Sequence, residues 1–151
     1  MENRTRKEII RTNKLKIIFD IDIVPASVDE AKVQVDVEGS LEILINGRTI
    51  FEEEGILLVE LAFYLSQWLK RFENNEIRNF YYESMDFEES PILEFVEIEN
   101  DLWNLSSLWQ KFANVDYLDL VELSNASKSY FDRLLHELKD KFSLDVSAFI
   151  L

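Results

Sequence analysis

His136 is the only histidine in the 151-residue chain, and two carboxylates stand at helical spacing around it. Asp132 and Asp140 lie four positions before and after it, so all three side chains share one face of a predicted helix. A carboxylate beside an imidazole can tune a general base or help to bind a metal ion. The same spacing is also typical of a solvated histidine between helical carboxylates, and we favour that interpretation.

Asp20 and Asp22 form a second acidic pair, similar to the paired aspartates of some metal-dependent transferases. Here both stand in an alternating strand pattern, which places them on the same solvated face. The sequence contains no G-x-S-x-G, HExxH, Walker, GxGxxG or EF-hand pattern. We therefore predict no catalytic residue, no metal and no cofactor, so that the chain is not an enzyme. A small hydrolase with two carboxylates is the remaining catalytic alternative.

The most unusual tract runs from Asn79 to Gln110 and contains eight acidic residues, many aromatic residues and no lysine or arginine. An acidic surface with aromatic anchors suits recognition of a basic protein, because charge speeds the encounter and buried rings hold the complex. Phe80, Phe95 and Trp103 fit a core role better than a surface role. The polar connection from residue 83 to residue 90 is harder to bury. In it we predict six partner-binding residues: Glu83, Met85, Asp86, Phe87, Glu88 and Glu89.

The elements that position these residues are clearest between residues 39 and 72. Apolar residues alternate from Leu41 to Ile45, which predicts a strand, and Asn46-Gly47 favours a type I′ hairpin turn. Residues 49–51 predict the return strand. Residues 52–54 are glutamates that we expect to lead into a helix, since carboxylates suit its positive end. The helix presents a stripe of apolar residues at spacings of three and four: Leu58, Leu61, Ala62, Leu65, Trp68, Leu69 and Phe72.

Alternation predicts further strands on both sides of this unit. They cover residues 15–24, 31–37, 77–82, 92–98 and 102–109, with a turn at Gly39-Ser40 and another at Asn100-Asp101. Ser124 or Ser127 is expected to cap a second long helix, whose apolar stripe is Tyr130, Phe131, Leu134, Leu138 and Phe142. Residues 115–123 fit either a strand or the start of that helix. Residues 144–151 are expected to form a last strand.

Together these elements predict an α+β fold, in which an antiparallel meander sheet carries two long helices packed on one face. The length suits one domain over residues 1–151, with residues 1–13 as a basic N-terminal segment that is frayed or helical. The predicted core contains Leu61, Leu65, Trp68, Leu134 and Leu138.

Composition and charge limit the function. The hydrophobic fraction of 47% excludes disorder, and the absence of cysteine excludes a disulfide framework. No apolar run approaches the roughly 18 residues of a membrane span, and the N-terminus lacks a signal-peptide pattern, so we expect a cytoplasmic protein without a membrane partner. Residues 1–16 hold six basic and two acidic residues, so this +4 segment precedes a body of −18 within a net charge of −14. Such a body favours basic protein partners over nucleic acid.

The strand, tight turn and helix from Leu41 to Leu69, ending in Ser66-Gln67-Trp68-Leu69, resemble a group of small bacterial proteins associated with polymorphic toxin systems. The segments 91–95 and 103–109 extend this resemblance along the chain. It implies a non-enzymatic immunity protein that binds and blocks a cognate toxin, and it carries over no binding residue by motif. The alternative is a cytoplasmic interaction or assembly module. We expect either a monomer or a homodimer.

Overall fold

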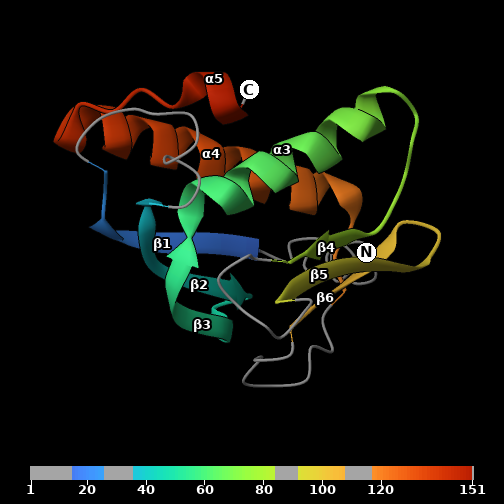
Figure 1. The fold of residues 1–151 in the computed structure, drawn as a ribbon. Helices are drawn as coiled ribbons and strands as arrows, with labels where there is room; N and C mark the ends of the chain where they lie inside the picture. Colours follow the sequence, from blue (N-terminus) through green and yellow to red (C-terminus); the bar gives the residue numbers. More distant parts are fainter. Residues whose placement is uncertain (1–14, 26–35, 84–91, 108–116, 151) are drawn as a thin grey trace, which may run out of the picture.

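The computed structural model describes residues 15–25, 36–83, 92–107 and 117–150. Its strands are β1 (Leu15–Ile23), β2 (Glu38–Ile45), β3 (Arg48–Leu57), β4 (Phe80–Tyr82), β5 (Leu93–Glu99) and β6 (Leu102–Ser106). Its helices are α3 (Leu58–Glu73), α4 (Leu120–Phe142) and the short α5 (Ser147–Ile150). Figure 1 shows α3 and α4 on one side of the molecule, above both groups of strands.

The strands form two antiparallel sheets of three, in the orders β1-β2-β3 and β4-β5-β6. The fold is therefore α+β as predicted, but the single meander sheet under two helices is wrong. The physical reason lies in α3, which follows β3 directly. Its 16 residues carry the chain about 24 Å before β4 begins, so β4 starts a second sheet instead of extending the first.

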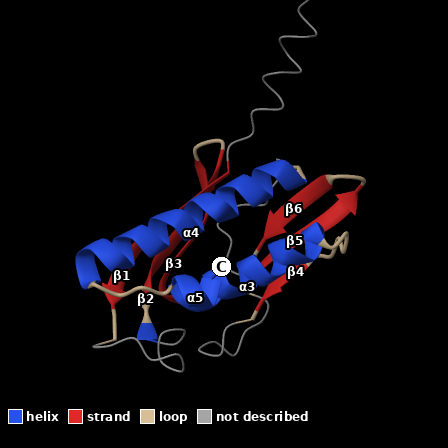
Figure 2. Ribbon diagram, turned by 90° about the horizontal axis from the view of Figure 1, so that it is seen from above, coloured by secondary structure: helices blue, strands red, loops and turns tan. Residues whose placement is uncertain are grey.

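The two long helices connect the two sheets. α4 packs on β1, α3 packs on β2 and on β4, and the two helices contact each other. Seen from above in Figure 2, they cross over the strands of both sheets. Among the described residues, no helix combines the length and apolar character that a membrane span requires.

The turn predicted at Gly39-Ser40 is wrong, because both residues lie within β2. Gly39 pairs with Ile21 on one side and Ile56 on the other. A side-chain carbon at position 39 would lie 1.9 Å from the carbonyl oxygen of Asp20, so the glycine permits a close approach of two strands. The strand predicted for residues 31–37 falls mostly outside the described residues.

The hairpin turn is confirmed, with positive φ at Asn46 (54°) and Gly47 (79°). The expected role of Glu52, Glu53 and Glu54 is wrong, because they belong to β3 and not to the start of a helix. β3 continues through a positive-φ glycine at Gly55 to Leu57, and α3 begins at the next residue. Glu52 and Glu54 are exposed and Glu53 is partly buried, whereas Ile56 and Leu57 at the end of the strand are buried.

All five predicted core residues are buried, which confirms that prediction: Leu61, Leu65, Trp68, Leu134 and Leu138. Trp68 extends from α3 into the second sheet. Its ring contacts Phe80, Phe95 and Trp103, and its Nε1 donates to the carbonyl of Arg78 at 2.7 Å. α3 ends at Asn74-Asn75 as predicted.

The second sheet follows the predicted pattern with shorter strands. In β4, Phe80 and Tyr82 are buried and Tyr81 is exposed, as their alternation indicated. The turn at Asn100-Asp101 is confirmed, with Asp101 at a φ of 56°. β6 ends at Ser106, and the last two residues of the strand predicted for 102–109 lie outside the described residues.

The two ends of the C-terminal region differ from the prediction. Asp119 caps α4 by accepting from the N–H of Glu122 at 2.8 Å, so the helix begins before Ser124 and Ser127, which are not its cap. The last strand predicted for residues 144–151 is also wrong. There the Asp145 carboxylate accepts from the backbone N–H and hydroxyl of Ser147, and α5 follows.

Candidate partner-binding face

Only one of the six predicted partner-binding residues lies in the described part of the chain. Glu83 is exposed and directly follows β4. Met85, Asp86, Phe87, Glu88 and Glu89 lie outside the described residues, so the structure does not place them. The described part of the acidic tract consists mainly of β4, β5 and β6.

The aromatic residues of this tract divide between the core and the surface. Phe80, Phe95 and Trp103 are buried, as the core interpretation predicted. Tyr81 faces the other way with 52% of its surface exposed, and it pairs across the strands with Glu94. Glu94 in turn accepts from the hydroxyl of Ser106 at 2.9 Å. The side of this sheet that points away from the helices thus combines a carboxylate with an exposed ring.

The first sheet presents a similar surface, which sequence reasoning missed. Ile18, Glu42 and Glu52 lie in one row across β1, β2 and β3, and Asp20 follows Ile18 on the same face. The hydroxyl of Thr49 donates to Glu42 at 2.6 Å. The sequence pattern predicts that Glu52 leads into a helix, so it does not place this residue on the face of a sheet. Its alternation with the buried Phe51 was the signal that could have found it.

Glu42 and Glu52 are direct partners across the strands. Like charges in this position destabilise a sheet by tenths of a kcal/mol, because their side chains are held close together. We use the name strand face for the outward residues of both sheets, which point away from α3 and α4: Ile18, Asp20, Glu42, Glu52, Tyr81 and Glu94. Figure 1 shows both sheets on the side of the molecule away from α3 and α4.

Charge is divided unequally between the strands and the long helices. Two basic residues, Lys16 and Arg48, lie in the six strands, whereas α3 and α4 hold six basic and six acidic residues. The strands hold ten acidic residues: Asp20, Asp22, Glu38, Glu42, Glu52, Glu53, Glu54, Glu94, Glu97 and Glu99. Within the described elements, the strands therefore carry the negative charge while the long helices are balanced.

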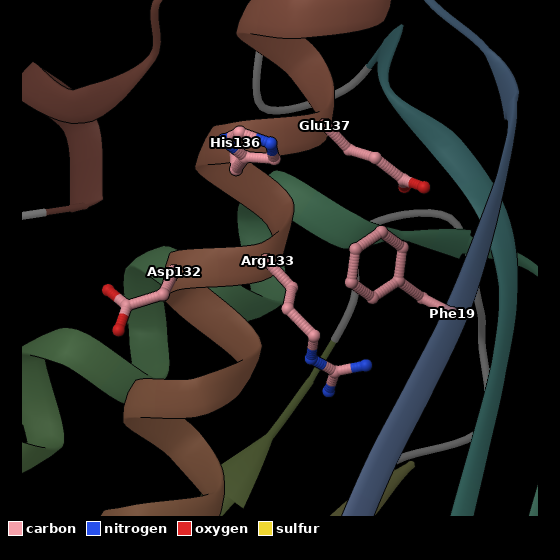
Figure 3. Close-up of a pocket in the computed structure, with 5 residues that line it drawn as sticks. All are labelled: Phe19, Asp132, Arg133, His136 and Glu137. Atoms are coloured by element: carbon pink, nitrogen blue, oxygen red, sulfur yellow. The ribbon is translucent and has the colours of Figure 1, made fainter.

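The exposed positions of Asp132 and Asp140 on α4, four residues either side of His136, agree with the favoured interpretation of a solvated histidine between helical carboxylates. His136 is exposed and lies beside a hollow of about 530 Å³ between α4 and β1, also lined by Phe19, Asp132, Arg133 and Glu137. In Figure 3, Arg133 and Glu137 extend towards Phe19, whereas Asp132 points to the other side of the helix. Arg133 donates to the carbonyl of Ile17 and lies 5.6 Å from the centre of the Phe19 ring.

Asp20 and Asp22 are both exposed, as predicted. In the described part of the chain, the metal-ligating residue types do not gather in groups of three or more.

Two buried polar contacts lie deeper in the fold. Glu60 is only 2% exposed and accepts from the hydroxyl of Tyr82 at 2.8 Å, which joins α3 to β4. Tyr130 donates to the carbonyl of Leu58 at 2.6 Å. Burial raises the pKa of the Tyr130 phenol well above its usual range, and the nearby Arg133 only partly opposes this. Both contacts connect elements that are distant in the sequence.

Comparison with known proteins places the chain in one family. No curated protein and no solved structure matches it significantly. A family model matches residues 11–140, which is most of the chain and includes both sheets, α3 and most of α4. The chain therefore belongs to the family described as Domain of unknown function (DUF7878).

Proposed function

We propose that this chain is a non-enzymatic binding domain whose strand face engages a basic protein. The observation that carries the proposal is the division of charge, with ten acidic and two basic residues on the strands against six of each on the long helices. Acidity that served solubility alone has no reason to concentrate on one layer. Acidic residues that are concentrated on the strands give the molecule a negative side, which orients a basic partner before contact.

The strand face also offers apolar surface among its carboxylates. Ile18 is 38% exposed and lies next to Glu42 across the strands, and Tyr81 lies next to Glu94 in the same way. Binding energy in protein interfaces comes mainly from such desolvated side chains, while the surrounding charges set the association rate.

We further propose that the partner is a toxin and that the chain acts as an immunity protein in the cytoplasm. The support is the resemblance of residues 41–69, 91–95 and 103–109 to proteins of polymorphic toxin systems. Glu83 directly follows Tyr82 at the end of β4, and Met85, Asp86, Phe87, Glu88 and Glu89 come next in the chain. In this proposal they extend the contact from the strand face, with Phe87 as the anchor.

Two variants with the same change in net charge test the proposal. The strand variant carries Glu42→Gln, Glu52→Gln and Glu94→Gln, which keep an oxygen for the hydrogen bonds of Thr49 and Ser106. The helix variant carries Glu73→Gln, Asp132→Asn and Asp140→Asn, three exposed carboxylates of α3 and α4. The immobilised full chain is used to capture proteins from a lysate of the native host, and retained proteins are eluted with salt and identified.

The expected result is a basic protein that the wild type and the helix variant retain and the strand variant loses. Its activity, measured after purification, should be inhibited at a one-to-one ratio with the chain. Equal retention by both variants would contradict the role of the strand face. A basic partner that binds but keeps its full activity would contradict the immunity role alone.

A further inference from the structure

β1 is an edge strand in the part of the chain that the structure describes. There it pairs with β2 on one side, and no described strand pairs with its other edge. The carbonyl oxygen of Asp20 points at β2, since it lies 1.9 Å from where a side chain at Gly39 would begin. The carbonyl of Ile17 points the opposite way, because Arg133 donates to it from α4. Even-numbered residues of β1 thus bond to β2, and odd-numbered ones direct their backbone groups outward.

Hollows lie on both sides of Arg133 along this edge. One, of about 530 Å³, is lined by Phe19 and by residues of α4 that include Glu137. The other, of about 360 Å³, is lined by Leu15, Ile17 and Ile18 on β1 and by Ala126 on α4. Within the described residues, Arg133 is the one side chain with a hydrogen bond to the outward edge of β1. An exposed edge of this kind is a template for another strand.

The outward face of β1 is complementary to itself. From Lys16 to Asp20 it presents a cation, the exposed Ile18 and an anion at alternate positions. In an antiparallel pair of two β1 strands centred on Ile18, each Lys16 lies opposite the other copy's Asp20. Ile18 then meets its own counterpart. Among the described residues, Lys16 and Asp20 form no close ion pair within one chain, and Lys141 of α4 interacts with Asp20 only as a nearby opposite charge.

We propose that two copies of this chain associate through their β1 edges, about a two-fold axis at Ile18, to form one continuous six-stranded sheet. In this register the outward backbone groups of Leu15, Ile17, Phe19 and Ile21 form about eight hydrogen bonds between the copies. The pairs Leu15–Ile21 and Ile17–Phe19 form on the side of the helices. The interface is isologous, as a two-fold axis requires. It goes beyond the proposed function, because it needs no other partner.

Arg133 competes with the second copy for the same position. Its guanidinium occupies the carbonyl of Ile17, which the paired strand must reach. On association, Arg133 moves from this carbonyl into the space beside Glu137, which lines the same hollow. Removing the side chain in Arg133→Ala should therefore strengthen the dimer, although it deletes a charged residue of the interface region.

A charge exchange tests the register. Sedimentation velocity of the full chain over a range of concentrations gives the dissociation constant of the dimer. Lys16→Glu places two glutamates opposite two aspartates, and Asp20→Lys places lysines opposite lysines. Each should raise the dissociation constant about tenfold or more. The double variant Lys16→Glu/Asp20→Lys restores both opposite pairs and should return the constant to near the wild-type value.

A single cysteine provides a second test, because the chain contains none of its own. Position 18 meets itself at a non-hydrogen-bonded site, where the two Cα atoms lie about 4.5 Å apart, within the range for a disulfide. Ile18→Cys should oxidise rapidly to a covalent dimer. Tyr81→Cys, on the exposed face of the other sheet, should not. Lys16→Cys alone should not, but a mixture of Lys16→Cys and Asp20→Cys chains should.

Thermal melts establish that each variant is folded before it is compared. A chain that stays monomeric at several hundred micromolar would overturn the proposal. A dimer that is indifferent to the charge exchange, with equal cross-linking at positions 18 and 81, would overturn the β1 interface. Each of these measurements uses the chain alone, so its failure is distinct from failure of the basic-partner proposal.

Discussion

Glu60 shows how one buried side chain can join two parts of the fold. Its carboxylate is almost fully enclosed and accepts from Tyr82 on the second sheet. A buried acceptor that loses its donor has a desolvation cost that no hydrogen bond offsets. No sequence motif predicts that Glu60 is buried. The helical pattern places it on the wetter face, opposite the apolar stripe, and this prediction is wrong because the side chain is buried.

Tyr82→Phe should lower the free energy of unfolding by about 1.5–3 kcal/mol, since it removes the hydroxyl that binds the Glu60 carboxylate. Tyr81→Phe is the matched control. It removes the same atom from the neighbouring residue on the exposed face and should change stability by less than about 0.5 kcal/mol. Urea titrations of both variants provide the comparison. Equal effects would show that the Glu60 contact does not stabilise the fold.

Tyr130 provides a prediction about alkaline pH. Its pKa is raised in the folded chain by burial, from an ordinary value of 10.0. The folded state therefore holds the proton more tightly than the unfolded state, so this contribution is complete below pH 10 and is lost as the pH rises further. Above pH 10 the wild type should lose up to about 1.4 kcal/mol of stability per pH unit relative to Tyr130→Phe.

Chemical denaturation at several pH values between 8 and 11 measures this difference. At pH 8, Tyr130→Phe should be less stable by about 1 kcal/mol, since it lacks the hydrogen bond to the carbonyl of Leu58. The two stability curves should then converge as the pH rises. Curves that stay parallel over the whole range would contradict a raised pKa at Tyr130.

At the scale of elements, local signals predicted local structure well. The Asn46-Gly47 turn, the helix from Leu58 and its end at Asn74-Asn75 all follow from residue types within a few positions. The N-cap of α4 was predicted at the wrong residue. Asp119, Ser124 and Ser127 can all cap a helix, and only the hydrogen-bond geometry identifies Asp119 as the cap.

The division of the strands into two sheets could not be predicted from such local signals. Strand alternation shows which residues are buried, but it does not show which strands pair, because pairing depends on where α3 delivers the chain. The acidic strand face could not be predicted for the same reason. The sequence places Glu52 next to the following helix, but it does not show that Glu42 is its partner across the sheet.

A substitution at Trp68 tests whether α3 is the element that both sheets share. Its ring packs on Phe80, Phe95 and Trp103, whereas the beginning of α3 contacts β2. Trp68→Ala should cost about 3–5 kcal/mol and leave a single cooperative unfolding transition. Tyr81→Ala removes an exposed ring from the second sheet and should cost much less. Calorimetry that resolves two separate transitions would contradict a shared core.

At the scale of the whole molecule, the arrangement of charge matters more than its total. A net charge of −14 attracts any basic protein, whichever side carries it. The concentration of acidic residues on the strands adds orientation, so that one side meets the partner first. Net charge and the number of acidic residues can be read from the sequence. Their separation from α3 and α4 needed the placement of both sheets below the helices (Figure 1).

The most direct test of this account is the association rate of the captured basic partner with the strand variant and the helix variant, measured by surface plasmon resonance at two salt concentrations. Both variants lose three negative charges, so a difference between them reports position alone. We predict that the strand variant associates about tenfold more slowly at low salt and with a weaker salt dependence, while the helix variant stays near the wild type. Equal slowing of both variants would contradict the account, because net charge alone would then explain the attraction.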